Sequence, residues 1–202
     1  MTTLPAPFAG FQVDHARHVC AFFDSDDDQY RILLPFIKDG LECGDKAVHV
    51  IRPEQQGDHL KRLAAAGIDP ATTQQRGQLE LRTTTETYLR DGHFDPDRML
   101  ALFEGLSGGT PISRFVCQMD WAADDEALVE RIVEFESRVN RIWCKCEDMV
   151  ICVYPPARFG GQAVMDIMRT HPSVIVGGIL HRNPFFVPPE DFLPGLRERR
   201  AR

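Results

Sequence analysis

The fold of this chain is decided by the stretch Ser113-Arg114-Phe115-Val116-Cys117-Gln118-Met119-Asp120-Trp121. Its apolar residues form a short run, which opens after Thr110-Pro111 and closes on Ala122-Ala123-Asp124-Asp125. An apolar run between turn signals is typical of a strand that is buried on both faces. This run ends in an acidic and a large aromatic residue, and ligands bind at the carboxyl ends of strands in open α/β sheets. We therefore expect this strand end to border the functional site.

Strand-like and helix-like segments alternate on both sides of that stretch. The other expected strands are 18–23, 46–52, 79–83, 148–154 and 173–180, and helices are expected to begin near Ser25, Pro53, Pro96, Asp125, Gly160 and Glu190. Such alternation predicts an α/β fold with a mostly parallel central sheet and helices on both faces. Pro35 is expected to kink the first helix or to mark its boundary.

No internal repeat or linker divides the chain, so the sequence predicts one domain. We expect a flexible leader over residues 1–14, a single domain over 15–196 and a basic tail over 197–202. A chain end of this kind is usually solvated and frayed rather than a binding surface.

The composition excludes several partner classes. With 30 acidic against 23 basic residues the net charge is −7, which argues against a nucleic-acid or anionic-membrane surface. No apolar run approaches the ~20 residues of a membrane span, and the N-terminus lacks the features of a signal peptide, so we expect a cytoplasmic protein. Its six cysteines should then be reduced, with Cys20, Cys117 and Cys152 buried as small apolar residues.

The turn after the first strand argues against nucleotide chemistry. A phosphate-binding loop needs glycines and a following Lys-Ser/Thr, whereas Asp24-Ser25-Asp26-Asp27-Asp28 has neither and would repel a triphosphate. Cys144-Lys145-Cys146 falls short of the paired ligands of a zinc site, so no metal or other cofactor is expected. No Gly-x-Ser-x-Gly elbow occurs, and His59 and His93 are expected on the surface. We therefore expect a protein that is not an enzyme.

Several motifs carry a family resemblance. They are His18-Val19-Cys20-Ala21-Phe22-Phe23 with the acidic turn, Leu34-Pro35-Phe36-Ile37-Lys38-Asp39-Gly40-Leu41, Met119-Asp120-Trp121, Arg169-Thr170-His171-Pro172, Gly177-Gly178, and His181-Arg182-Asn183-Pro184-Phe185-Phe186-Val187-Pro188-Pro189. Together they resemble the MEDS family, the methanogen/methylotroph DcmR sensory domain, over roughly residues 15–193. The resemblance implies a RecA/KaiC-like fold with a degenerate P-loop, and a role in signal transduction that involves small organic ligands such as hydrocarbon derivatives.

This chain departs from the family pattern in two ways. Cys117-Gln118 stands where members often carry Gly-Glu, and 202 residues leave no room for the helix-turn-helix or kinase-type domain that many members have. The resemblance thus implies signalling through a regulatory partner in trans or through self-association.

The predicted ligand pocket lies at the ends of strands 18–23, 113–121 and 148–154. In it, Trp121 and Tyr154 would form apolar walls, and His18, Asp120 and Arg158 would supply polar contacts beside Cys20. A purely structural role is the alternative for each of these residues. Trp121 could pack in the core, Asp120 could cap a helix or form an ion pair, and His18 could form a buried hydrogen bond.

Two alternatives remain open from the sequence. The protein could be an interaction module whose arm (Asn183, Pro184, Phe185 and Phe186) docks on a partner without a small-molecule ligand. Residual nucleotide binding is the third hypothesis.

Overall fold

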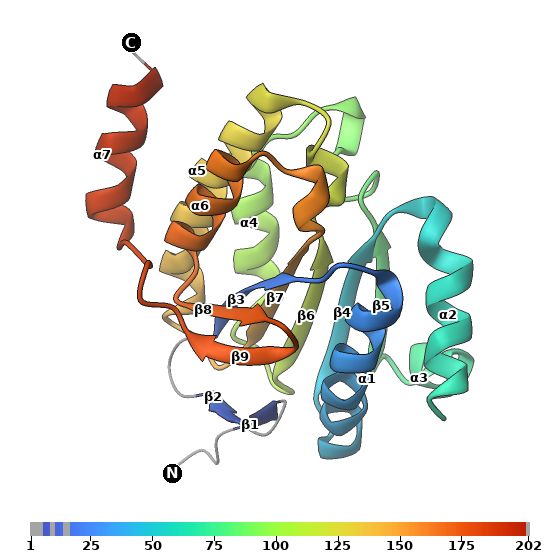
Figure 1. The fold of residues 1–202 in the computed structure, drawn as a ribbon. Helices are drawn as coiled ribbons and strands as arrows, with labels where there is room; N and C mark the ends of the chain where they lie inside the picture. The colour runs from blue at the N-terminus through green and yellow to red at the C-terminus, as the bar shows by residue number, and fades with distance from the viewer. Residues whose placement is uncertain (1–5, 9–10, 14–16, 201–202) are drawn as a thin grey trace.

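The central sheet has seven strands in the order β5-β4-β6-β7-β3-β8-β9 in the computed structural model, which describes residues 6–8, 11–13 and 17–200 (Figure 1). Neighbouring strands run parallel except β8 and β9, which pair antiparallel. The strands span His18–Phe22 (β3), Lys46–Ile51 (β4), Leu79–Thr83 (β5), Ser113–Gln118 (β6), Met149–Tyr154 (β7), Ser173–Val176 (β8) and Ile179–Arg182 (β9). The predicted α/β class with a mostly parallel sheet is therefore confirmed.

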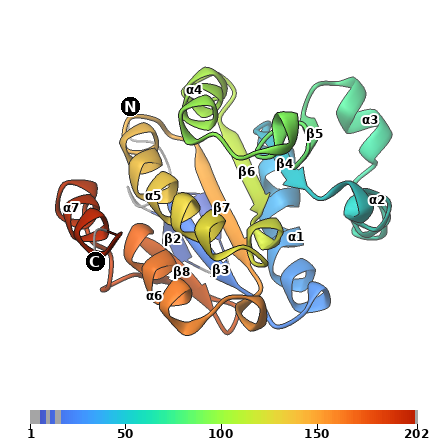
Figure 2. The same cartoon turned by 90° about the horizontal axis from the view of Figure 1, so that it is seen from above.

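Helices cover both faces of this sheet (Figure 2). On one face lie α4 (Pro96–Leu106), α5 (Glu126–Trp143) and α6 (Gly161–Thr170), with α7 (Pro189–Arg200) packed against α5 and α6. The other face carries α1 (Asp26–Cys43) and α2 (Gln56–Ala65), and α3 (Pro70–Gln75) contacts β5. Because successive strand residues point to opposite faces, two separate apolar cores result, one containing Cys20 and Cys152 and the other Val19 and Ile151.

The first helix begins and ends where its sequence indicates. The Ser25 hydroxyl accepts a hydrogen bond from the Asp28 amide at 3.2 Å, and three aspartates in the first turn suit the positive end of the helix dipole. Gly44 ends the helix in the left-handed region at φ 88°. The helix continues through Pro35 to Cys43, so Pro35 does not mark its boundary.

The predicted strand 173–180 is wrong, because the structure divides this segment into the β8–β9 hairpin. Gly177 and Gly178 both have positive φ, 59° and 77°, as a type I′ turn requires. Glycine adopts this backbone without steric cost, so the chain reverses here instead of extending. The reversal places β9 at the edge of the sheet.

The chain ends also differ from expectation. Within the expected leader, β1 (Ala6–Phe8) and β2 (Phe11–Val13) pair antiparallel, and residues 1–5, 9–10 and 14 lie outside the described residues. Residues 197–200 do not fray but continue α7, where Arg199 pairs with Asp166 at 3.0 Å and Arg200 with Glu134 at 2.6 Å. Residues 201–202 lie outside the described part.

His59 is buried, contrary to the surface position expected for it. It lies on the buried face of α2 and is 3% exposed, with Tyr30 Oη 2.7 Å from its Nδ1 and His49 Nδ1 2.9 Å from its Nε2. Burial lowers the pKa of His59 to about 4, so the imidazole is neutral at pH 7. No helix among the described residues combines the length and apolar character needed to cross a membrane.

Candidate functional site

A cavity of about 120 Å³ opens at the carboxyl edge of the sheet. It is bounded by the ends of β3, β6 and β7, the three strands at which the sequence predicts a pocket, and by Gln55 after β4. Its lining combines apolar side chains, carboxylates and side-chain amides, contributed by Phe23, Asp24, Ser25, Asp26, Gln29, Gln55, Gln118, Asp120, Val153 and Pro155. The cavity therefore has a mixed polar and apolar lining with several acidic side chains.

The Asp120 side chain in this cavity is held in place by two arginines. It lies just after β6 in the short helix η3 (Asp120–Ala122), 7% exposed, and its Oδ2 accepts hydrogen bonds of 3.2 Å from both Arg52 and Arg158. Arg158 also donates to Asp124 at 2.6 Å. The second carboxylate oxygen, Asp120 Oδ1, is buried and has no hydrogen-bond partner among the described residues. A buried acceptor of this kind is costly unless a further donor satisfies it.

Trp121 does not line the cavity. Its ring stacks on Tyr88 with ring centroids 4.9 Å apart and lies 5.6 Å from the ring of Phe94. These rings belong to an aromatic group in the core beneath α4 and α5, which also includes Phe103 and Phe135. The structural reading of Trp121 as a core aromatic is the one that its contacts support.

Tyr154 also lies away from the cavity. Val153 lines the cavity and Tyr154, the next residue of β7, lies on the opposite face of the sheet, where it is fully buried. Its hydroxyl donates a 3.0 Å hydrogen bond to Glu136 Oε1 on α5. The apolar atoms of the cavity come instead from Phe23, Val153 and Pro155.

His18 belongs to a second site, a buried cluster between the sheet and α5. The cluster comprises His18 at the start of β3, Glu136 on α5, Cys152 on β7 and His171 just before β8. His18 Nε2 lies 3.0 Å from Glu136 Oε2, and His171 Nε2 lies 3.5 Å from the same oxygen. Cys152 Sγ lies 3.7 Å from His18 Nε2 and 3.8 Å from Glu136 Oε2.

The neighbouring thiol of Cys20 is not part of this cluster. It is fully buried on β3 and donates to the Ser173 carbonyl oxygen at 3.7 Å. Burial raises the pKa of the Cys20 thiol far above its usual range, so it remains protonated at neutral pH. The structure thus separates His18, Cys20 and Tyr154 from Asp120 and Arg158, although the sequence analysis groups them in one pocket.

Glu136 carries a negative charge at the centre of the buried cluster. Burial alone would raise the pKa of its carboxyl, but the facing imidazoles of His171 and His18 hold that pKa well below its usual range. Glu136 was not identified from the sequence, because there it cannot be distinguished from the other charged residues of α5. Its one signal is position: residues 132, 135, 136 and 139 share the buried face of that helix, where a carboxylate requires a partner.

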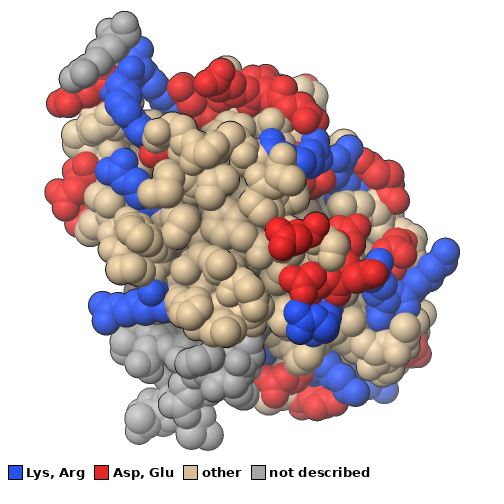
Figure 3. Space-filling model, viewed as in Figure 1, with Lys and Arg blue, Asp and Glu red and all other residues tan. Residues whose placement is uncertain are grey.

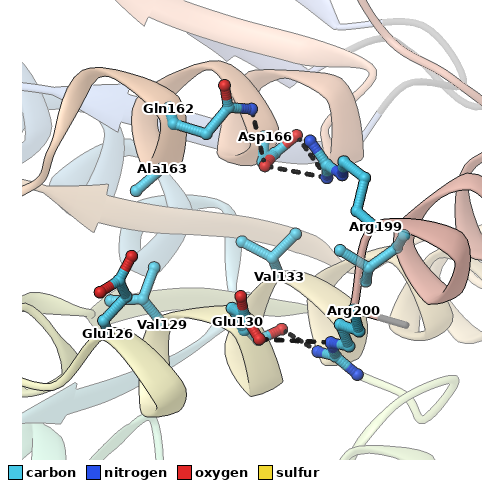
Figure 4. A pocket seen from close by; sticks show the side chains of 10 residues that line it. Glu126, Val129, Glu130, Val133, Gln162, Ala163, Asp166, Arg199 and Arg200 are labelled. Carbon is cyan, nitrogen blue, oxygen red and sulfur yellow. Dashed lines mark hydrogen bonds and ion pairs between the residues drawn. The ribbon is translucent and has the colours of Figure 1, made fainter. Parts of the chain in front are cut away.

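A larger groove of about 340 Å³ lies between α5, α6 and α7 (Figure 4). Four of its charged side chains are paired across the groove, since Asp166 binds Arg199 and Glu130 binds Arg200, while Val129 and Val133 supply apolar atoms. Apart from Glu126 these charges already have protein partners, which makes this groove a weaker candidate for a polar ligand than the edge cavity.

The four residues of the predicted docking arm divide into two groups. Asn183 is buried, and its amide donates to the carbonyl oxygens of Met168 and His171, so this side chain is not available to a partner. Pro184 and Phe185 are exposed, Phe185 by 53%, and Phe186 is half-buried. Of the predicted arm, Phe185 thus presents the largest apolar surface.

Comparisons with known proteins agree with this architecture. The crystal structure of the KaiC-like protein PH0186 from Pyrococcus horikoshii OT3 superposes with a TM-score of 0.63 at 16% identity, over 85% of this chain and 79% of that one. This similarity confirms the KaiC-like, RecA-type fold. The transcriptional repressor DcmR of Methylorubrum extorquens is 21% identical over 168 residues, which are 81% of this chain and 61% of the repressor. This chain therefore matches less than two thirds of the length of that relative.

The family assignment rests on residues 17–172, which match the model of the MEDS family, the methanogen/methylotroph, DcmR sensory domain. These residues include four of the motifs that carry the resemblance, namely the first strand with its acidic turn, the segment 34–41, Met119-Asp120-Trp121 and Arg169-Thr170-His171-Pro172. The chain belongs to the MEDS family of sensory domains.

Proposed function

We propose that this sensory domain binds a small, polar organic molecule in the edge cavity and does so without catalysis. The observation that carries the proposal is Asp120 Oδ1, a buried acceptor without a partner among the described residues, in a cavity at the carboxyl ends of parallel strands. The two arginines on Oδ2 fix the position of the carboxylate, so that Oδ1 is presented to a ligand donor.

The size and charge of the cavity narrow the class of ligand. An engineered apolar cavity of about 150 Å³ accepts benzene, so a cavity of about 120 Å³ suits a molecule of roughly six heavy atoms or fewer. Asp24, Asp26 and Asp120 disfavour anions, and the amides of Gln29, Gln55 and Gln118 favour hydrogen-bonding groups. A hydrocarbon derivative that carries a hydroxyl or amino group fits this description, whereas a nucleotide does not.

The proposal predicts that Asp120→Ala strongly weakens ligand stabilisation. A screen of small alcohols, amines, amides and carboxylic acids by thermal shift should raise the melting temperature with hydroxyl or amino compounds, and the increase should depend on concentration. The apparent affinity, read from the concentration dependence of the thermal shift, should be at least about tenfold weaker in the variant than in the parent protein. This is the effect expected from loss of a charge-assisted hydrogen bond.

Asp124→Ala is the matched control for this experiment. Asp124 also pairs with Arg158 but does not line the cavity, so its removal should leave the ligand-induced shift intact. Equal loss of the shift in both variants, or a shift that survives Asp120→Ala, would count against Asp120 as the ligand acceptor. If the carboxylic acids alone stabilise the protein, the proposed ligand class is wrong.

We further propose that ligand binding is communicated to a regulatory protein or to a second copy of the chain. The surface that contacts this partner would be the β8–β9 hairpin and the arm that follows it. Val176, Ile179 and Phe185 are exposed there by 47–53%, and β9 is an edge strand of the sheet. The face of the molecule over β8, β9 and α6 carries few charged side chains (Figure 3). Apolar exposure beside an open strand edge is typical of a protein-docking surface.

Phe185→Ser is expected to abolish self-association or partner capture without unfolding the domain, because the side chain is more than half exposed. Phe185→Leu, which keeps an apolar side chain, is the control and should retain most of the association. Light scattering measures self-association, and pull-down from a cell extract measures partner capture. Association that is equal in the two variants would exclude Phe185 from the interface.

A further inference from the structure

The geometry points to a second binding site: His18, Glu136, Cys152 and His171 form a four-ligand site for a divalent transition-metal ion of the zinc type. The four donor atoms come from four separate elements, and all lie within 4.8 Å of one another. All four side chains are at most 2% exposed. This site is distinct from the edge cavity, which lies at the carboxyl ends of the strands, whereas His18 stands at the first residue of β3.

The spacing of the donor atoms approaches that of a tetrahedral site, with no two of them more than 4.8 Å apart. Zinc bonds of about 2.0–2.3 Å to nitrogen, oxygen and sulfur place tetrahedral ligands roughly 3.3–3.8 Å apart. Three of the four measured separations fall in that range: 3.5 Å from Glu136 Oε2 to His171 Nε2, 3.7 Å from Cys152 Sγ to His18 Nε2, and 3.8 Å from Cys152 Sγ to Glu136 Oε2. The fourth, from His18 Nε2 to Glu136 Oε2, is 3.0 Å.

Outer hydrogen bonds turn both imidazoles toward this centre. His171 Nδ1 lies 2.8 Å from the Ile167 carbonyl oxygen, which can only accept, so Nδ1 carries the hydrogen and Nε2 keeps its lone pair. His18 Nδ1 lies 3.0 Å from Asn140 Oδ1, and the amide nitrogen of Asn140 is held by the Thr170 carbonyl oxygen at 2.8 Å. Metal-bound histidines are typically fixed in this way through their second nitrogen.

The inward nitrogen of His171 supplies an independent observation. His171 is 0% exposed, and its Nε2 has no hydrogen-bond partner among the described residues. A buried acceptor that faces a carboxylate oxygen and a thiol is satisfied by a cation bound at the centre of the cluster. A divalent ion there would balance the charges of the Glu136 carboxylate and a Cys152 thiolate, leaving the buried site neutral.

The number of ligands indicates the role of the ion. Zinc sites that use four protein ligands are closed and structural, while catalytic sites keep a position open for water. Here the ion would connect β3, β7, α5 and the segment that leads into β8. Tyr154, which donates to the other oxygen of Glu136, would act as a positioning residue for that carboxylate. The site would thus join the centre of the sheet to the helix above it.

The test uses the full-length chain with any affinity tag removed. Elemental analysis of the purified protein is expected to give close to one zinc ion per chain. Protein refolded with Co²⁺ as the probe should show the near-ultraviolet thiolate-to-cobalt absorption and the strong visible bands of tetrahedral cobalt. A parent protein with less than about 0.1 metal ion per chain, and without these bands after refolding with Co²⁺, would overturn the proposal.

Cys152→Ser and Cys117→Ser form a matched pair, because Cys117 is equally buried and stands opposite Cys152 in the β6–β7 register. The thiolate-to-cobalt band should disappear in Cys152→Ser and persist in Cys117→Ser. A band that persists in Cys152→Ser, or one that is lost only in Cys117→Ser, would contradict the ligand assignment. Circular dichroism checks that both variants fold, and if Cys152→Ser does not, the metal content and cobalt spectrum of the parent protein decide.

Discussion

Glu136→Ala is expected to destabilise the fold by about 3–5 kcal/mol, the usual cost of removing one partner from a buried charged group. Glu136 is 1% exposed, accepts the hydrogen bond of Tyr154 Oη and faces the imidazoles of His18 and His171. Alanine leaves the Tyr154 hydroxyl without its acceptor, removes the carboxylate that faces both imidazoles and opens a cavity between α5 and the sheet. Small domains have a free energy of unfolding of roughly 5–15 kcal/mol in total, so the variant should be marginal at 25 °C.

Chemical denaturation followed by circular dichroism measures this effect, with Glu134→Ala as the control on the same helix. Glu134 forms a partly exposed ion pair with Arg200, and such pairs contribute less than about 1 kcal/mol. The two variants should therefore differ by at least about 2 kcal/mol in the free energy of unfolding. Similar losses in both would show that the buried cluster is not a centre of stability.

Asn183→Ala is expected to cost about 2–4 kcal/mol, because one side chain satisfies three backbone groups. Its amide nitrogen donates to the carbonyl oxygens of Met168 and His171 at 2.6 and 2.7 Å, and its Oδ1 accepts from the Phe185 amide at 3.0 Å. Both carbonyls lie at the carboxyl end of α6, where regular helical partners run out, although the Met168 carbonyl oxygen also accepts from the His171 amide at 3.3 Å. Loss of Asn183 should loosen the whole arm as well as lower stability.

Thermal and chemical unfolding of Asn183→Ala should be compared with His181→Ala, an exposed position in the same hairpin. Surface substitutions usually change the free energy of unfolding by less than about 0.5 kcal/mol, so His181→Ala should resemble the parent protein. Hydrogen exchange should also show faster exchange of the Phe185 amide in Asn183→Ala. Stability that is unchanged in this variant would mean that the arm is held mainly by other contacts.

Much of the fold could be predicted from local patterns. The strand at residues 113–118, the Ser25 cap and the alternation of strands and helices are set by apolar runs and capping residues that act over a few positions. The β8–β9 hairpin was predicted wrongly because a run of apolar residues hides the turn at Gly177-Gly178. Hydrophobic periodicity does not reveal that the chain reverses at these two glycines, both of which have positive φ.

The sites could be predicted only in part. The position of Asp120 at the edge cavity could be predicted because it follows a buried strand, and position at a strand end is a local property. The cluster of His18, Glu136, Cys152 and His171 was missed because its members are up to 153 residues apart and meet only through β-sheet register and the packing of α5. His18 was assigned to the carboxyl-edge pocket, although it is the first residue of its strand and therefore lies at the opposite end.

The central claim is that a small polar molecule binds in the edge cavity beside Asp120, and nuclear magnetic resonance tests it most directly. Isotopically labelled protein would be titrated with the compound that gives the largest thermal shift. The account predicts that the affected amides cluster at residues 24–29, 118–120 and 153–155, with a dissociation constant that matches the thermal data. Shifts that spare these residues and concentrate at the α5–α7 groove, or at the 176–186 hairpin and arm, would contradict it.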